Sequence, residues 1–287
     1  MAAGVTTGIA PDTQALQGPP GTDIHLVSLS SLAGRLHVGT ARNLTERPGY
    51  DNQPAFSPDG ATLWYTSIGP AGQADVCRVV LQRGERRCVE TRSESEYSPT
   101  PMPGGGISVV RVEADSAQRL WRLDDAGQWS LILPQARPVG YHAWLDSDRV
   151  LLFLLGNPAV AVLANRTTGH MDTVARNVGR SLHRIPGTST LSFPQRIDTT
   201  WWVMRFDPAG AGPDPVAPAP AGAQDHAWLP DGSLLMARGN RLYRWTSGTV
   251  GWELLHAFSE PGLQRISRLA VSPAGDRLAL VGQESRP

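Results

Sequence analysis

The sequence predicts an all-β protein, and within that class a six-bladed β-propeller, from three observations. A phrase of strand, Pro-Asp-Gly-type turn and strand recurs along the chain, its copies follow one another at a nearly constant interval, and no stretch shows sustained helical periodicity. A hairpin repeated at such an interval is typical of a propeller, because each blade is a small sheet that buries its two faces only against neighbouring blades.

The repeated phrase has three clear copies, at residues 55–65, 227–236 and 270–280. Each places an apolar strand before Pro-Asp-Gly or Pro-Ala-Gly and a second apolar strand after it. Proline presets the φ angle of one turn residue, aspartate bonds to its own backbone, and glycine supplies a positive φ. Each copy therefore predicts a β-hairpin.

Three weaker copies fill the intervals, at residues 100–110, 143–153 and 183–193. One position can be aligned in all of the copies: Phe56, Pro101, Trp144, Arg184, Trp228 and Val271. The steps between them are 45, 43, 40, 44 and 43 residues. Such steps suit four short strands with their turns, so six anchors predict six blades.

Alternating polar and apolar residues predict a further strand in the second half of several repeats. Such runs occupy residues 76–81, 119–123, 201–206 and 241–245. The segment 208–223 is rich in Pro, Ala and Gly, which predicts a loop with one weak strand.

The two ends of the chain predict how the ring closes. The last repeat supplies only two strands, up to residue 282, whereas strand-like segments at 23–29, 36–38 and 43–45 open the chain. We therefore expect the last blade to combine two C-terminal and two N-terminal strands, which leaves no long sheet edge exposed. Residues 1–22 are expected to form an extended leader, and residues 23–287 a single propeller domain.

The composition excludes several kinds of function. The 26 basic and 26 acidic residues cancel, so nothing favours nucleic acid or an anionic membrane as a partner. All of the basic residues are arginine, which excludes Schiff-base lysine chemistry. The sequence contains no apolar stretch long enough for a transmembrane helix. We expect a monomer.

Two cysteines, Cys77 and Cys88, flank a predicted turn at residues 82–84. If that turn centres between Gln82 and Arg83, the cysteines face each other across two strands and can form a disulfide. The alternative is a pair of buried free thiols. A disulfide would fit an oxidising compartment, so we expect a periplasmic or secreted protein. Residues 1–15 lack the apolar core of a signal peptide.

A binding site is expected at the mouth of the central channel, because the innermost strand of each blade runs along it. The candidate ligand-binding residues just before the anchors are Gln53, Tyr97, Tyr141, His142, Asp225, His226 and Arg268. Arg268 and Asp225 could recognise a carboxylate or the terminal group of a peptide, or could form an ion pair in the channel wall. The two tyrosines could stack on a sugar or peptide, or simply fill gaps.

Two of these candidates, His142 and His226, occupy equivalent places in Tyr-His-Ala-Trp and Asp-His-Ala-Trp. They could hold a divalent metal together with Asp225. Alternatively, each histidine packs beside its tryptophan and bonds to the backbone of a neighbouring blade. No other cofactor is expected. The sequence has no Gly-x-Ser-x-Gly and no His-Glu-x-x-His motif, so no catalytic residue is assigned.

The phrase Ala55-Phe56-Ser57-Pro58-Asp59-Gly60, the strand around Cys77 and the final repeat resemble the WD-like repeat of TolB-type six-bladed propellers. The resemblance covers residues 23–284 and implies a protein exported in Gram-negative bacteria. The sequence shows no separate N-terminal α/β domain, in contrast to TolB. The same repeat occurs in periplasmic scaffolds, sugar lyases and the propeller halves of serine peptidases, so the resemblance does not fix the function.

Three hypotheses follow. The first is a non-enzymatic, exported propeller that binds a protein, peptide or glycan at the channel face. The second is a metal-assisted glycan lyase or hydrolase acting at the channel mouth. The third is the propeller portion of a peptidase-like protein.

Overall fold

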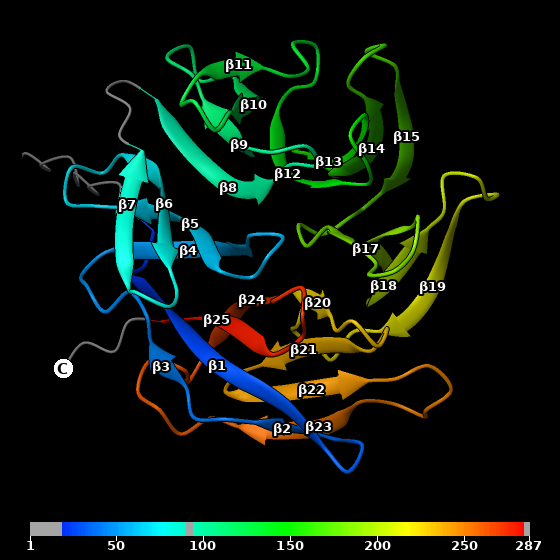
Figure 1. Ribbon diagram of the computed structural model, residues 1–287. Helices are drawn as coiled ribbons and strands as arrows, with labels where there is room; N and C mark the ends of the chain where they lie inside the picture. Colours follow the sequence, from blue (N-terminus) through cyan, green and yellow to red (C-terminus); the bar gives the residue numbers. More distant parts are fainter. Residues whose placement is uncertain (1–18, 90–93, 284–287) are drawn as a thin grey trace, which may run out of the picture.

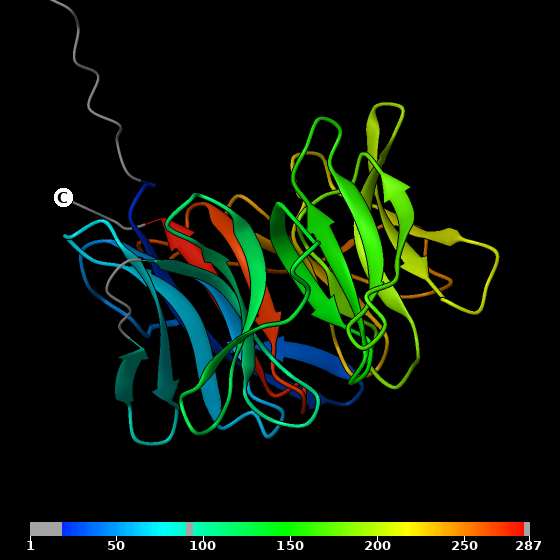
Figure 2. The ribbon, with the colours of Figure 1, turned by 90° about the horizontal axis from the view of Figure 1, so that it is seen from above.

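The chain folds as an all-β propeller in a computed structural model that describes residues 19–89 and 94–283 (Figure 1). The sheets stand around a common centre (Figure 1), and Figure 2 shows the same arrangement after a turn of 90°. No described residue belongs to a helix, as the sequence predicts, and hence none to a helix that could span a membrane. The expected leader falls, up to residue 18, outside the described residues.

Four of the sheets have four strands each, and within each sheet the strands pair antiparallel in chain order. The first contains β8 (Ser95–Pro101), β9 (Ile107–Val112), β10 (Gln118–Leu123) and β11 (Trp129–Leu131). The second contains β12 (Val139–Trp144), β13 (Arg149–Leu154), β14 (Val160–Asn165) and β15 (Met171–Arg176). The third contains β16 (His183–Arg184), β17 (Leu191–Ile197), β18 (Thr200–Phe206) and β19 (Pro213–Pro218). The fourth contains β20 (His226–Trp228), β21 (Leu234–Arg238), β22 (Arg241–Trp245) and β23 (Glu253–Ala257).

The remaining nine strands form one sheet in which the two ends of the chain meet. One run contains β4 (Tyr50–Phe56), β5 (Thr62–Ile68), β6 (Ala74–Val80) and β7 (Glu85–Val89). The other contains β24 (Ile266–Val271), β25 (Arg277–Gln283), β1 (Thr22–Leu32), β2 (Arg35–Val38) and β3 (Arg42–Asn43). β1 pairs antiparallel with β25 along residues 22–28, and a single parallel pair, Thr22 with Tyr50, joins the two runs. Two C-terminal strands are thus completed by N-terminal ones, as the sequence predicts.

The Pro-Asp-Gly turns form the predicted hairpins. Gly60 has a φ of 70° and Gly232 a φ of 80°, a region that other residues rarely adopt. Asp59 Oδ1 accepts a hydrogen bond from the backbone N–H two residues later at 3.0 Å, and Asp231 Oδ1 does the same at 2.9 Å. Each turn reverses the chain between the innermost strand of a sheet and the next strand out.

The core consists of separate hydrophobic clusters, most of which lie between two neighbouring sheets. In one of them, Leu151 of β13 packs with Phe193 of β17, and both side chains are fully buried. Trp144 and Trp228 lie in two other clusters of this kind. Since each sheet buries apolar side chains on both faces, the hydrophobic effect holds the sheets side by side around the centre.

Candidate binding site in the central channel

A cavity of about 690 Å³ opens at the end of the ring where the innermost strands enter their first hairpin turns. We call it the funnel. We call the lining at the first hairpin turns the rim; it includes five prolines: Pro58, Pro103, Pro186, Pro230 and Pro273. We call the lining near the starts of the innermost strands the floor; it includes Tyr141, Arg180, Asp225 and Arg268. The funnel therefore has an apolar rim and a polar, arginine-containing floor.

The residues proposed from the sequence divide between the funnel and the structure around it. Those that line the funnel are Gln53, Tyr141, His142, Asp225 and Arg268. Tyr97 and His226 do not line it.

Arg268 of β24 crosses the channel to Tyr141 of β12. β24 lies between β20 and β4, and β12 lies between β8 and β16, so the two strands stand on opposite sides of the ring. Arg268 Nη2 donates a hydrogen bond of 2.6 Å to Tyr141 Oη, and its guanidinium carbon lies 4.7 Å from the centroid of the phenol ring. This contact combines a charge-assisted hydrogen bond with a cation–π interaction.

Asp225 holds the same guanidinium from the neighbouring sheet. Its Oδ2 lies 3.5 Å from Arg268 Nη1, and its Oδ1 accepts a hydrogen bond of 3.0 Å from the backbone N–H of Leu269. Arg268 is only 8% exposed. Burial favours a lower pKa for this guanidinium, but Tyr141, Asp225 and Tyr50 outweigh burial and hold the pKa above its usual value. Arg268 is thus a fixed positive charge in the floor.

Arg180, which the sequence analysis did not single out, adds a second positive charge to the floor. It is exposed, and it has neither a hydrogen bond nor an ion pair within the described part of the chain. Its charge acts on Tyr50, at the start of β4. Burial raises the pKa of the Tyr50 phenol to about 12, while Arg268 and Arg180 act in the opposite direction. The only sequence signal was an arginine four residues before the repeat anchor Arg184.

His142 and His226 lie in two equivalent polar contacts between sheets. His142 Nε2 lies 2.6 Å from Ser108 Oγ on β9, and Trp144 Nε1 donates to the same oxygen at 2.8 Å. His226 Nε2 lies 2.9 Å from Ser192 Oγ on β17, where Trp228 Nε1 also donates at 2.8 Å. In each case a His-Ala-Trp strand holds a serine of the preceding sheet.

This geometry does not bring His142, His226 and Asp225 together. The Nε2 atoms of the two rings contact serines at two different interfaces, and Asp225 accepts hydrogen bonds from Arg268 and the Leu269 backbone. Across residues 19–89 and 94–283, no three His, Cys, Asp or Glu side chains gather as a metal site would require. Each histidine bonds to the neighbouring sheet, but its partner is a serine side chain and not the backbone expected from the sequence.

Both rings are neutral at physiological pH. Burial lowers the pKa of His142 to about 3 and lowers that of His226 well below its usual value. Ser108 Oγ also donates to the carbonyl of Thr100 at 3.2 Å, so its lone pairs receive hydrogens from Trp144 and His142. His142 then carries its proton on Nε2, and its buried Nδ1 has no hydrogen-bond partner.

Gln53 and Ser98 join the first two innermost strands at the funnel wall. Both have a left-handed backbone, with φ of 58° and 54°, at breaks in the pairing of β4 with β5 and of β8 with β9. Gln53 Oε1 accepts hydrogen bonds from the Ser98 backbone N–H at 2.7 Å and from Thr66 Oγ1 at 2.8 Å. The Gln53 amide is therefore held in place before any ligand arrives.

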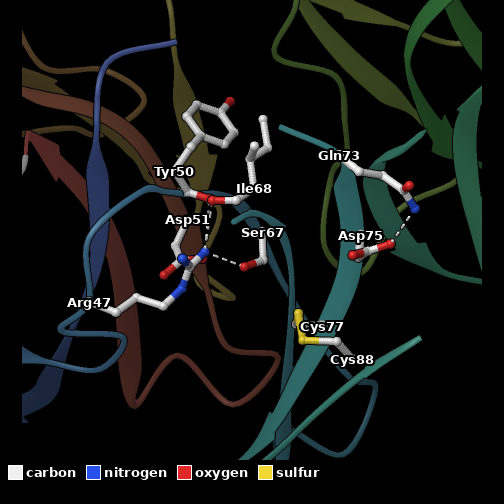
Figure 3. The surroundings of a disulfide bond; sticks show 9 residues. All are labelled: Arg47, Tyr50, Asp51, Ser67, Ile68, Gln73, Asp75, Cys77 and Cys88. Carbon is white, nitrogen blue, oxygen red and sulfur yellow. Dashed lines mark hydrogen bonds and ion pairs between the residues drawn. A yellow bond between two sulfur atoms is a disulfide. The ribbon is translucent and has the colours of Figure 1, made fainter. Parts of the chain in front are cut away.

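Cys77 of β6 and Cys88 of β7 lie opposite each other and form a disulfide (Figure 3). In the same blade, Arg47 donates hydrogen bonds to the buried carboxylate of Asp51 and to Ser67 Oγ. Burial raises the pKa of Asp51, and the hydrogen bonds from Arg47 and Ser67 oppose that effect. Neither cysteine lines the funnel, so the disulfide is a feature of the sheet and not of the cavity.

Comparisons with known proteins show the fold. No protein-family model matches the sequence, and no curated protein matches it. Among solved structures, a protein assigned as TolB from Agrobacterium tumefaciens is similar, with a TM-score of 0.71 and 15% identity over 94% of this chain and 100% of that one. TolB from Acinetobacter baumannii gives a TM-score of 0.60 and 13% identity over 93% of this chain and 65% of that one.

A third similar structure is the tricorn protease, with a TM-score of 0.57 and 15% identity over 83% of this chain and 27% of that one. All three identities are low, so the likeness extends to the fold alone. The chain shares a β-propeller fold with TolB and with other propeller proteins.

Proposed function

We propose that this chain is a non-enzymatic, exported propeller that binds a protein, peptide or glycan in the funnel. The observation that carries the proposal is the funnel itself, a cavity of about 690 Å³ with an apolar rim and polar groups converging on its floor. Its volume lies within the usual range of ligand pockets, about 300–1,000 Å³.

The floor is organised before binding. Arg268 is fixed by Tyr141 and Asp225, and Gln53 is fixed by Ser98 and Thr66. Side chains that already hold their bound conformation lose little conformational entropy when a ligand arrives, which favours affinity.

The same proposal includes six blades and a single propeller domain over residues 23–287. The nine-stranded sheet would divide at the Thr22–Tyr50 pair into two blades. In support, a hydrophobic cluster packs Ile24 and Val281 of one run against Leu63 and Cys77 of the other, as happens between separate sheets elsewhere in the ring. We also infer a monomer whose repeats are of the WD-like, TolB type.

Export is supported by the disulfide and by the resemblance of the repeats. The Cys77–Cys88 pair would persist in a periplasmic or extracellular environment and would be reduced in the cytosol of most organisms. Alkylation of freshly lysed cells, before any reduction, tests this point. Two blocked thiols in the native host would contradict an oxidising location, and two thiols that react only after reduction would support it.

The binding proposal is tested with a variant that fills the funnel. Ala270 lines the funnel and is only partly buried, so Ala270→Trp places a large side chain in the cavity. Val250→Trp is the matched control, because Val250 is fully exposed and does not line the funnel. The probes are an array of octapeptides and an array of neutral and acidic oligosaccharides.

We expect at least one class of probe to bind the parent protein and the Val250→Trp variant equally, and Ala270→Trp at least tenfold more weakly. Both variants should melt cooperatively. Binding that survives Ala270→Trp would contradict the funnel as the site. Stoichiometric metal in the purified protein, together with cleavage of any oligosaccharide on the array, would overturn the non-enzymatic proposal in favour of the lyase or hydrolase hypothesis.

A further inference from the structure

We infer that the funnel takes the C-terminal end of a peptide or protein, with the terminal carboxylate bound at Arg180 and Tyr141. The inference deepens the proposed function and depends on it, because it names the chemical group that the floor recognises. Three features of the floor support it. Arg180 has no hydrogen bond or ion pair among the described residues, the Tyr141 hydroxyl donates to no acceptor there, and the contact of Arg268 with Tyr141 spans the channel.

The charges of the floor do not balance. It contains two guanidinium groups, Arg180 and Arg268, against one carboxylate, Asp225. Asp225 already accepts from Arg268 and from the Leu269 backbone, and Arg180 has no ion pair within the described residues. A monoanion at this place would neutralise the excess positive charge, and a guanidinium can bind a carboxylate through two parallel hydrogen bonds.

The floor also offers donors rather than acceptors. Tyr141 Oη accepts from Arg268, and its own hydrogen is given to no acceptor in the described part of the chain. Arg180 also lines the cavity, and its guanidinium carries N–H donors only. A carboxylate is an acceptor-only group, so it matches both of these donors, whereas an ammonium group would meet two guanidinium charges of its own sign.

The contact between Arg268 and Tyr141 across the channel favours the end of a peptide over an internal peptide segment as the ligand. Because Arg268 contacts Tyr141 on the opposite strand, the floor spans the ring. A ligand that approaches from the rim can reach Arg180 and Tyr141 with its terminus, while its preceding residues lie against the apolar rim. The prolines of the rim, with Phe56 and Trp144, supply apolar surface for those residues.

The test compares the same peptides with and without the negative charge of the C-terminal carboxylate. Each octapeptide of the array is made twice, attached through its N-terminus, once with a free C-terminal carboxylate and once with a C-terminal amide. We expect the parent protein to bind its preferred carboxylate peptides at least tenfold more tightly than the matching amides. Raising the salt concentration from 50 to 500 mM should weaken the carboxylate peptides more than the amides.

Variants assign the effect to Arg180. Arg180→Gln should reduce carboxylate binding at least fivefold and leave amide binding unchanged, and Arg180→Lys should retain part of it. Arg83→Gln is the matched control, because Arg83 is an exposed arginine outside the funnel. Tyr141→Phe should also weaken the carboxylate peptides, because it removes the donor hydrogen.

The outcomes separate the two proposals. If carboxylate and amide peptides bind equally and Ala270→Trp abolishes both, the carboxylate inference is wrong and the binding function remains. If only acidic oligosaccharides bind, the carboxylate is recognised but the peptide source is wrong, which overturns the inference as stated. If no probe binds in the funnel, the proposed function itself fails.

Discussion

Consecutive residues on or just before two innermost strands make different contacts in this protein. Tyr141 and Asp225 lie in the floor of the funnel and contact Arg268, whereas His142 and His226, one position later, bond to serines of neighbouring sheets. His142 also lines the funnel, yet its Nε2 atom is engaged by Ser108. A polar residue beside a propeller channel therefore cannot be assigned to ligand binding until its contacts with the neighbouring sheets are known.

The two sets also respond to burial in opposite ways. His142 and His226 are buried as neutral rings, because no charged group compensates their loss of water, and their pKa values fall. Arg268 is almost as buried, but Asp225 and Tyr141 keep its pKa high. We therefore expect the histidine contacts to contribute stability, and the arginine floor to contribute ligand recognition.

Breaking the ring should disrupt the arginine floor and the histidine contacts together, and it should have the largest effect on stability. Deleting residues 266–287 removes β24, with Arg268, and β25, which pairs with β1 along residues 22–28. We expect no cooperative thermal transition in calorimetry. The control is a circular permutant that joins residue 283 to residue 22 and opens the chain at the exposed turn between Val250 and Gly251. It retains every strand and should melt cooperatively; if the truncated chain does so too, the ring does not depend on this closure.

Removing a serine from either histidine contact should cost about 2–3 kcal/mol of unfolding free energy. Ser108→Ala leaves Trp144 Nε1 and His142 Nε2 buried without their partner, and Ser192→Ala does the same to Trp228 and His226. Urea denaturation measures both. Similar losses at the two sites would support equivalent contacts. Ser30→Ala is the control: Ser30 is exposed, so the unfolding free energy should change by less than about 0.5 kcal/mol. A loss at only one site would contradict the equivalence.

Acid should weaken the histidine contacts through protonation. The folded-state pKa of His142 is about 3, below the ordinary 6.5, so its neutral ring contributes stability that is complete above pH 6.5 and is lost as the pH falls toward 3. Each such histidine lowers the unfolding free energy by roughly 1.4 kcal/mol per pH unit in that window. Urea denaturation between pH 7 and pH 5 measures how the unfolding free energy falls with pH. This fall per pH unit should be smaller for His142→Gln than for the parent protein. An unchanged slope would mean that the ring is not buried as a neutral group.

Loosening the floor should have a smaller effect on stability. Tyr141→Phe removes the oxygen that accepts from Arg268 but keeps the ring beneath the guanidinium and leaves Asp225 in place. We expect a loss of about 1.5 kcal/mol, a typical value for a hydrogen bond to a charged group. The same urea denaturation measures it, and a loss below about 0.3 kcal/mol would show that the contact across the channel is energetically unimportant.

The smallest effect on stability is expected for Arg180→Gln. Arg180 is exposed and has no partner among the described residues, so the unfolding free energy should change by less than about 0.5 kcal/mol. Together with a fivefold loss of carboxylate binding, this result would separate recognition from stability most clearly. A loss above 1 kcal/mol would place Arg180 with the structural residues instead.

The sequence predicts local features of this fold well. The Pro-Asp-Gly hairpins, the two-ended closure and the opposition of Cys77 and Cys88 depend on residues close in sequence or on a repeating pattern, and the structure contains all of them. Even the Pro-rich segment after residue 208 contains its single strand, β19. Turn chemistry and strand alternation were sufficient to predict these elements.

The contacts of the site were not predictable in the same way. Arg268 and Tyr141 are 127 residues apart and meet only because the ring brings opposite strands together. The direction of His142 depends on where Ser108 of the preceding sheet lies, which a single repeat does not encode. Arg180 was not predicted as a site residue, because the repeat around Arg184 is one of the weaker copies. Its innermost strand, β16, is only two residues long, so the sequence pattern locates it poorly.

The pairing of β1 with β25 has a consequence for biosynthesis. β1 leaves the ribosome among the first segments of the propeller, and its partner β25 is made after every other strand of the ring. Until then β1 has an unsatisfied edge, and such an edge can pair with the wrong chain. Completion of the native topology must therefore wait until β25 has been made, and β1 must be kept from other chains until then.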